Sequence, residues 1–151
     1  MKKYSEKRMD LFTVSPEYAL VHCISSDFAM GAGIAKRFTA MGVKEKLVGT
    51  YPQKWDGHGY HLVTGMKDFI VVNLITKEKY WMKPTYQTLR ESLETMRDWV
   101  VDQNRCYWVT EIKLAMPKIG CGLDRLEWPK VREIIQDVFK DTEIEILVCY
   151  Q

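Results

Sequence analysis

Apolar residues along this chain are spaced in two ways, as near-continuous runs and at helical intervals, which predicts strands that alternate with helices. Near-continuous apolar runs are typical of strands covered on both faces of a sheet. We expect strands at residues 3–8, 18–24, 60–65, 69–76, 112–116 and 144–149. The first run is predicted to be an edge strand, and residues 66–68 form a tight connection between neighbouring strands.

Three amphipathic patterns predict helices. The first covers residues 33–48, the second follows Pro84 and the third begins at Pro129, since proline is favoured in the first turn of a helix. The second has an apolar stripe made of Tyr86, Leu89, Leu93, Met96 and Val100. Strands that alternate with such helices indicate an α/β fold with three layers, an α/β/α sandwich.

Two glycine loops leave predicted strands and lead towards helices. One is Met30-Gly31-Ala32-Gly33-Ile34-Ala35, and the other is Ile119-Gly120-Cys121-Gly122-Leu123-Asp124. Glycine lets a backbone approach a ligand closely, and N–H groups near a helix start bind phosphate. Ligands in such sheets bind beyond the carboxyl ends of strands, so both loops should meet there and form two walls around a diphosphate. The alternative is two ordinary strand-to-helix turns, because short glycine motifs often occur without a ligand.

Two charged residues at this edge are candidates for chemistry. Asp124 ends the second glycine loop and could act as a base, or could only complement a helix dipole. Lys77 ends the apolar strand and could attack an electrophilic carbon, or could be a solvated surface lysine. Asp10 could accept a hydrogen bond from a nucleobase amino group or cap a turn, and Ser25 could donate to a ligand or to the backbone.

Composition narrows the class of protein. A length of 151 residues fits one domain, covering 1–151. The net charge of +2 arises without a basic block, which argues against a dedicated nucleic-acid-binding protein. The four cysteines form no Cys-x-x-Cys pair, so we expect reduced thiols and a cytoplasmic protein. We expect no targeting segment, no membrane partner and no metal, because apolar runs are short and no cluster has ligand spacing.

Several segments together carry a specific resemblance. They are Asp10-Leu11-Phe12, His22-Cys23-Ile24-Ser25, Met30 to Ala35, Leu74-Ile75-Thr76-Lys77, Lys83-Pro84-Thr85-Tyr86, Pro117, and Ile119 to Leu126. In this order the chain resembles a macrodomain, specifically the terminal ADP-ribose protein glycohydrolase subgroup, also called O-acetyl-ADP-ribose deacetylases. The resemblance implies a mixed six-stranded sheet with ADP-ribose bound at its edge. It also implies an enzyme that needs no cofactor.

The resemblance assigns roles to individual positions. It implies that Lys77 and Asp124 carry the catalysis and that Asp10 reads the adenine amino group. The implied ADP-ribose contacts are Asp10, Leu11, Ser25, Met30, Gly31, Ala32, Gly33, Ile34, Thr76, Ile119, Gly120, Cys121, Gly122, Leu123 and, against adenine, Tyr150. The chain departs from many macrodomains at Met9, where they have glycine. It also lacks the asparagine-rich motif of the larger hydrolase classes, so an asparagine-assisted mechanism is not expected.

The leading hypothesis is a hydrolase that removes ADP-ribose from acidic side chains and deacetylates O-acetyl-ADP-ribose, with Lys77 as nucleophile and Asp124 as general base. The alternatives are a non-catalytic ADP-ribose-binding module, a phosphatase for ADP-ribose 1″-phosphate, and an enzyme acting on ADP-ribosylated nucleic acid. The expected partner is an ADP-ribosylated protein, and the expected state is a monomer. The expected compartment is the cytoplasm, or also the nucleus if the source is eukaryotic.

Overall fold

A mixed sheet organises the molecule. The computed structural model describes residues 1–106 and 111–151. The strands are β1 (Lys3–Arg8), β2 (Tyr18–Ser25), β3 (Tyr60–Gly65), β4 (Ile70–Lys77), β5 (Lys113–Met116) and β6 (Glu145–Tyr150). They form a six-stranded sheet in the order β1-β6-β5-β2-β4-β3, in which only the β3–β4 pair is antiparallel. Each strand lies where the apolar pattern predicts it, to within a residue at either end.

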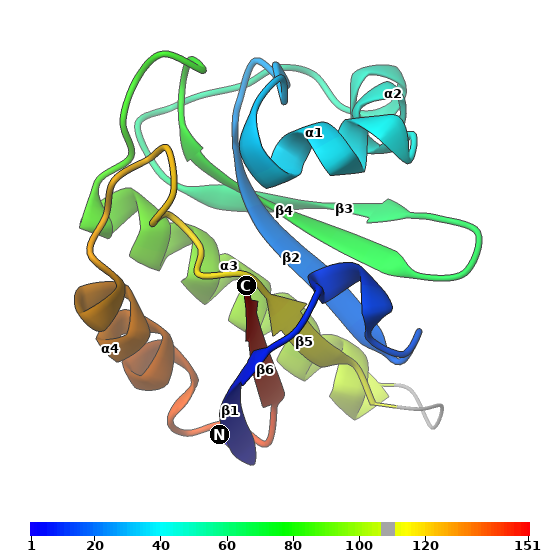
Figure 1. The fold of residues 1–151 in the computed structure, drawn as a ribbon, viewed down its shortest axis with the longest axis vertical. Helices are drawn as coiled ribbons and strands as arrows, with labels where there is room; N and C mark the ends of the chain where they lie inside the picture. Colours follow the sequence, from blue (N-terminus) through cyan, green and yellow to red (C-terminus); the bar gives the residue numbers. More distant parts are fainter. Residues whose placement is uncertain (107–110) are drawn as a thin grey trace.

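Helices cover both faces of this sheet, which confirms the predicted three-layer α/β/α sandwich (Figure 1). The helices are α1 (Gly33–Ala40), α2 (Val43–Thr50), α3 (Tyr86–Cys106) and α4 (Trp128–Phe139), with a 3-10 turn, η1, at Leu11–Thr13. Helices α1 and α2 lie on one face, and α3 and α4 lie on the other. No helix in the described part of the chain has the length and apolar content needed to cross a bilayer.

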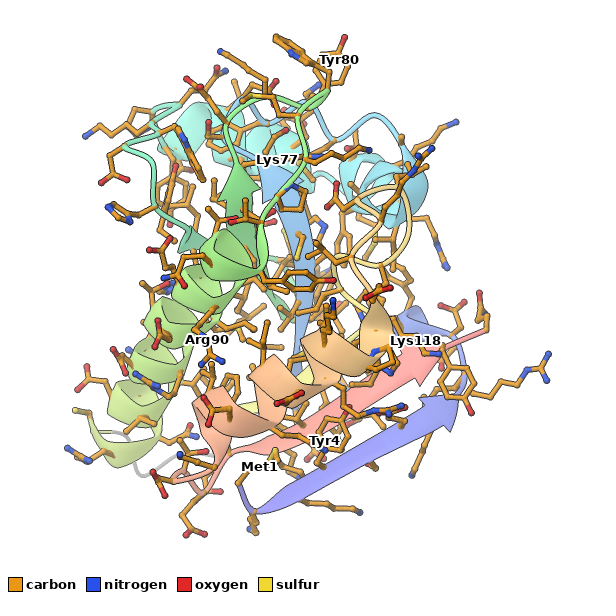
Figure 2. The ribbon with its side chains drawn as sticks, turned by 90° about the vertical axis from the view of Figure 1, so that its left-hand side faces the viewer. Met1, Tyr4, Lys77, Tyr80, Arg90 and Lys118 are labelled. Carbon is orange, nitrogen blue, oxygen red and sulfur yellow. The ribbon has the colours of Figure 1, made fainter. Side chains whose placement is uncertain are left out.

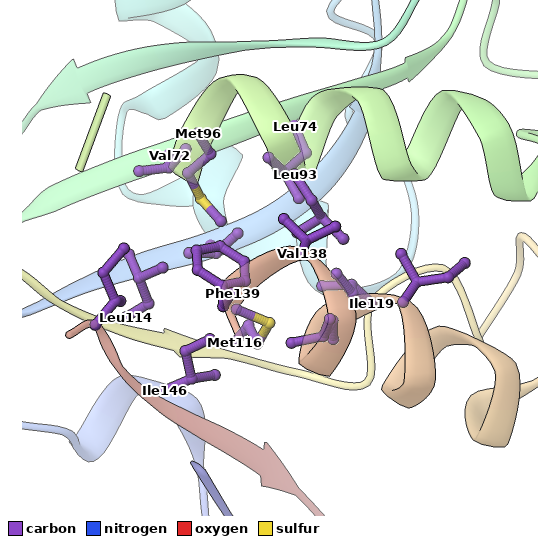
Figure 3. Packing of buried hydrophobic residues seen from close by; sticks show 14 of the residues in the cluster. Val72, Leu74, Leu93, Met96, Leu114, Met116, Ile119, Val138, Phe139 and Ile146 are labelled. Carbon is purple, nitrogen blue, oxygen red and sulfur yellow. The ribbon is translucent and has the colours of Figure 1, made fainter. Parts of the chain in front are cut away.

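The two layers of core follow from the alternation of side chains along the strands. In β4, Val72 and Leu74 pack under α3 and α4, whereas Val71 and Ile75 pack under α1 and α2. Figure 3 shows the core layer under α3 and α4, where Phe139 of α4 lies among side chains from the sheet and from α3. The predicted stripe on α3 is confirmed, since four of its five residues are fully buried there.

The predicted single helix over residues 33–48 is wrong, because the structure has two shorter helices there. Gly42 separates them with a φ of +94°, a left-handed conformation that ends α1 and redirects the chain into α2. Val43 and Leu47 remain buried after the turn. The apolar spacing therefore continues through the break, which is why periodicity alone does not show it.

Candidate active site

A cavity of about 770 Å³ lies beyond the carboxyl ends of β2, β4 and β5. Its walls are the loop between β2 and α1, the end of β4 with the residues that follow, and the loop between β5 and α4. The two glycine loops and the end of β4 therefore converge as the sequence predicts. The strand order explains this, because β2 pairs with both β4 and β5 and all three run parallel.

Lys77 and Asp124 meet inside this cavity. Lys77 Nζ donates a hydrogen bond to Asp124 Oδ1 at 2.7 Å, and the two side chains are only 13% and 15% exposed. Both residues line the cavity. A partly buried ion pair of this kind holds both groups in defined positions, and a proton can pass directly between them.

The loop between β2 and α1 has a constrained backbone. Phe28 and Met30 both adopt positive φ angles, 55° and 48°, which are unfavourable for residues with side chains and cost about 1 kcal/mol each. The Phe28 side chain is fully buried, so packing in the core holds this conformation. The Met30 carbonyl accepts a hydrogen bond from Thr39 Oγ1 at 2.9 Å. The loop is thereby fixed against α1 before any ligand binds.

Asp27 connects this loop to the segment after β4. Its carboxylate accepts hydrogen bonds from Ser25 Oγ at 2.5 Å, from the Ala29 N–H at 3.1 Å and from the Tyr80 N–H at 3.1 Å. Burial raises the pKa of Asp27, but these hydrogen bonds and the charge of Lys79 outweigh it and hold the pKa below its usual range. Ser25, an expected ligand contact, thus lines the cavity while donating its hydroxyl proton to Asp27.

The glycines leave parts of the cavity wall without side chains. A Cβ added at Gly31 or Gly122 would meet no atom closer than 4.0 Å. A Cβ at Gly33, where φ is +60°, would lie 3.6 Å from Leu123 Cδ1, so the two loops face each other across the cavity. Ala32 precedes α1 and has no polar side chain to cap the helix. The first N–H groups of α1 are therefore suited to bind an anion such as a diphosphate.

A second cavity of about 540 Å³ continues from the first, and the two share the lining residues Gly33, Ile34, Pro117, Lys118 and Gly122. Among the expected contacts, Asp10, Leu11, Cys121 and Tyr150 line this second cavity and not the first. Lys118 Nζ lies 4.8 Å from the centre of the Tyr150 ring. Two adjoining cavities suit an elongated ligand with one end near Lys77 and the other near Asp10.

Asp10 is held in place by two groups. Its Oδ1 accepts a hydrogen bond from the Phe12 N–H at 3.0 Å and another from Arg37 Nη1 at 3.1 Å. The Phe12 N–H, and then Arg37, lower the pKa of Asp10. The Arg37 guanidinium also lies 4.0 Å from the centre of the Phe12 ring. Asp10 therefore caps the η1 turn and still borders the cavity, so the two sequence interpretations of this residue are compatible.

Thr76 is the one expected contact that lines neither cavity. It is buried within β4, and its hydroxyl has no hydrogen-bond partner among the described residues. The other expected contacts all border one cavity or the other. Thr76 adjoins Lys77 in sequence, but successive residues of a strand point to opposite faces.

Four lining residues with charged or aromatic side chains were not among the expected contacts: Arg37, Tyr80, Lys83 and Lys118. Lys83 Nζ donates a hydrogen bond to the Leu123 carbonyl at 2.7 Å and so joins the segment after β4 to the second glycine loop. Arg37 follows Ile34 by three residues, and this helical spacing could have placed it on the same face. Tyr80 lies in a segment without periodic spacing of apolar residues, so no sequence pattern places it at the cavity. Within the described ranges, no group of three His, Cys, Asp or Glu residues is arranged to hold a metal ion.

Comparison with known proteins identifies the family. No family model matches the chain. The chain is 44% identical over 141 residues to ADP-ribose glycohydrolase OARD1 of Bos taurus, covering 92% of this chain and 86% of that protein. It is 42% identical over 141 residues to the Homo sapiens protein of the same name, with the same coverage.

Solved structures show the same fold. The macrodomain of Mycobacterium tuberculosis DarG has a TM-score of 0.77 and 20% identity, with 99% of this chain and 98% of that chain covered. Thermosipho africanus DarTG, solved in complex with ADP-ribose, has a TM-score of 0.72 and 17% identity, and the match covers all of this chain and 42% of that one. The chain belongs to the macrodomain family that includes ADP-ribose glycohydrolase OARD1.

Proposed function

We propose that this protein is an ADP-ribosyl hydrolase that releases ADP-ribose from acidic side chains and deacetylates O-acetyl-ADP-ribose, with Lys77 as nucleophile and Asp124 as general base. The observation that carries the proposal is the 2.7 Å contact between Lys77 Nζ and Asp124 Oδ1 inside the cavity. A protein that only binds ADP-ribose has no need of a largely buried lysine–aspartate pair at this place. The relatives named ADP-ribose glycohydrolase support hydrolysis as the reaction.

The adjoining cavities suggest how the substrate lies. Adenine would occupy the second cavity beside Asp10 and Tyr150, and the diphosphate would lie between the glycine loops at the start of α1. The distal ribose would then reach Lys77 and Asp124. Binding energy from the adenine and the phosphates would orient the reacting carbon, which converts affinity into rate.

The first chemical step breaks the ester. Asp124 takes a proton from the Lys77 ammonium, and the neutral amine attacks the anomeric carbon of the distal ribose. A C–N bond forms as the bond from that carbon to the ester oxygen breaks, and the acceptor carboxylate leaves with the bonding electron pair. If an acetyl ester occupies the same carbon, acetate leaves in the same way.

The second step returns the enzyme to its starting state. Asp124 gives its proton to solvent and then accepts a proton from a water molecule that attacks the same carbon. The C–N bond breaks, and the lysine leaves with the electron pair and recovers the proton from Asp124. The products are free ADP-ribose and one proton in solution, as the hydrolysis of an ester at neutral pH requires.

The test measures release of ADP-ribose from a glutamate-modified protein by the wild type, Lys77→Ala and Asp124→Ala. We expect Lys77→Ala to lower the rate by about 10³-fold or more and Asp124→Ala by about 10²–10⁴-fold. Calorimetric titration should show ADP-ribose affinity within a few-fold of the wild type for Lys77→Ala. Lys67→Ala is the matched control, since this lysine lies in the turn before β4, at the opposite end of the strand.

The outcomes separate the hypotheses. ADP-ribose binding by the wild type without any release from the modified protein would support a non-catalytic binding module. Normal release by Lys77→Ala would remove Lys77 as the nucleophile.

We also propose that the protein acts as a monomer in the cytoplasm. Its four free cysteines are consistent with a reducing compartment.

A further inference from the structure

Three consecutive residues of the segment between β4 and α3 expose large apolar side chains. Tyr80 is 63% exposed and Trp81 is 66% exposed, and Met82 follows them. Leu123, from the second glycine loop, is exposed as well. We call these four residues the rim patch. Large apolar side chains that lie together on a surface often mark a place where a partner binds.

The rim patch borders the mouth of the cavity. Tyr80 and Leu123 line the cavity together with Lys77 and Asp124. Lys83 joins the two segments of the patch, because its Nζ donates a hydrogen bond to the Leu123 carbonyl. Figure 2 shows Tyr80 at the outer end of the segment and Lys77 deeper in the molecule. Any group attached to the distal ribose at Lys77 therefore leaves the cavity next to the patch.

Backbone contacts hold the patch in shape. The Tyr80 N–H donates to Asp27 at 3.1 Å, and the Met82 N–H donates to the Lys79 carbonyl at 3.0 Å. The rings of Tyr80 and Trp81 meet edge to face, with centres 5.2 Å apart. A surface already ordered in this way loses little conformational entropy when a partner binds.

The composition of the patch favours a polypeptide partner over a nucleic acid. Of the three lysines that the segment carries, Lys77 is paired with Asp124, and Lys83 donates to the Leu123 carbonyl. Lys79 lies close enough to Asp27 for their charges to attract each other. Binding to nucleic acid depends on several cations that are free to contact phosphates. Trp, Tyr and Met are instead enriched at the centres of protein interfaces.

We propose that the rim patch binds the polypeptide that carries the ADP-ribose, by packing against apolar side chains beside the modified residue. This inference rests on the proposed function, because it assumes that ADP-ribose enters the cavity with its distal ribose at Lys77. The patch then adds affinity for the modified protein without touching the ADP-ribose itself.

The experiment uses Trp81, which does not line the cavity. Trp81→Ala is made in the Lys77→Ala protein, so that substrate binds without turnover. Dissociation constants are measured for free ADP-ribose, for a glutamate-modified protein and for single-stranded DNA that bears ADP-ribose on a base. We expect Trp81→Ala to weaken binding of the modified protein about tenfold, as loss of an interface tryptophan does, and to change binding of ADP-ribose less than twofold. Trp81→Phe keeps an aromatic ring and should restore most of the affinity.

Val48→Ala is the matched control, because Val48 is 58% exposed but lies on α2, away from the patch. The inference would be overturned if Trp81→Ala weakened the binding of ADP-ribose and of the modified protein equally. It would also be overturned if Trp81→Ala left the binding of the modified protein unchanged. A loss confined to single-stranded DNA bearing ADP-ribose on a base would overturn it in favour of nucleic acid. Failure of the wild type to hydrolyse ester-linked ADP-ribose would refute the proposed function separately, since these measurements report binding alone.

Discussion

Lys77 and Asp124 are 47 positions apart in the chain, and their side chains meet at 2.7 Å. Each carries a charge that is largely shielded from water, so removing one leaves the other without its partner. Breaking such a pair destabilises a protein more than breaking a surface pair does. Asp124→Asn, which keeps the shape and one acceptor oxygen, is therefore the better variant for separating loss of the base from loss of stability.

Gly59 has its place for a steric reason unrelated to the cavity. A Cβ at this position would lie 1.9 Å from the Thr88 carbonyl oxygen in the first turn of α3. The Gly59 N–H also donates to Glu91 Oε1 at 3.0 Å, which holds the start of β3 against the same helix. The backbone itself is the obstacle, so the added methyl group cannot be accommodated by a change of rotamer.

We predict that Gly59→Ala lowers the free energy of unfolding by about 2–3 kcal/mol or more, as overpacking does. Urea denaturation provides the measurement. Gly65→Ala is the control, because a Cβ there would meet nothing within 4 Å, and we expect a change below about 1 kcal/mol. A similar loss in both variants would contradict the steric explanation.

The loops at the carboxyl edge of the sheet act as one unit, because side chains join them. Asp27 connects the β2–α1 loop to the segment after β4, and Lys83 connects that segment to the β5–α4 loop. Ser26 Oγ adds a hydrogen bond to the Glu78 carbonyl at 2.8 Å. The geometry of the cavity therefore depends on contacts between elements as well as on each loop alone.

Asp27→Ala removes the acceptor for the Ser25 hydroxyl and for the N–H groups of Ala29 and Tyr80. Because an unpaired donor costs about 1–3 kcal/mol, we predict at least a tenfold loss of ADP-ribose affinity and a lower melting temperature. Calorimetric titration and thermal unfolding measure the two effects. Asp56→Ala is the control, since Asp56 also accepts an N–H two residues ahead, from His58, in an exposed loop. Its ADP-ribose affinity should remain unchanged.

His22 joins several elements in the interior of the molecule. It is fully buried in β2, its Nε2 lies 2.6 Å from Asn73 Oδ1 in β4, and its ring centre lies 4.0 Å from that of Phe38 in α1. Asn73 Nδ2 in turn donates to the Leu62 carbonyl of β3. Burial lowers the pKa of His22 from 6.5 to about 4, although the contact with Asn73 acts in the opposite direction.

This lowered pKa makes global stability depend on pH. Above pH 6.5 His22 is neutral in both the folded and the unfolded state, so its titration does not lower the free energy of unfolding there. As the pH falls, the unfolded chain binds a proton that the folded protein excludes, so stability decreases until the pH reaches about 4. We predict that His22 accounts for a loss of about 2 kcal/mol between pH 7.5 and pH 5.

Urea denaturation at several pH values tests this prediction by comparing the wild type with His22→Gln, which keeps a donor for Asn73. The variant should lose less stability over this interval. His58 and His61 are present in both proteins, so their contributions cancel in the comparison. Arg132 lowers the pKa of Glu6 to about 2, so that carboxylate titrates below the interval. Parallel pH profiles for the two proteins would refute the role of His22.

The positions of the strands and of α3 follow from local patterns, since a buried strand or an amphipathic helix must be apolar at fixed intervals. The run before Lys77 and the stripe from Tyr86 to Val100 illustrate this. The break between α1 and α2 was missed because apolar spacing continues through Gly42, and only the backbone angle there reveals the turn. The two glycine loops were found because glycine at such places is itself visible in the sequence.

Residue types and their order along the chain were enough to indicate the sheet, its covered faces, the family and the lysine and aspartate at its edge. Side-chain contacts between distant segments were not visible in this way. Neither the pairing of Arg37 with Asp10 nor the placement of Thr76 outside both cavities has a local pattern. No local pattern in the sequence indicates the exposed rings of Tyr80 and Trp81 beside the cavity. Such contacts depend on strand order and loop conformation, which result from the packing of the whole chain.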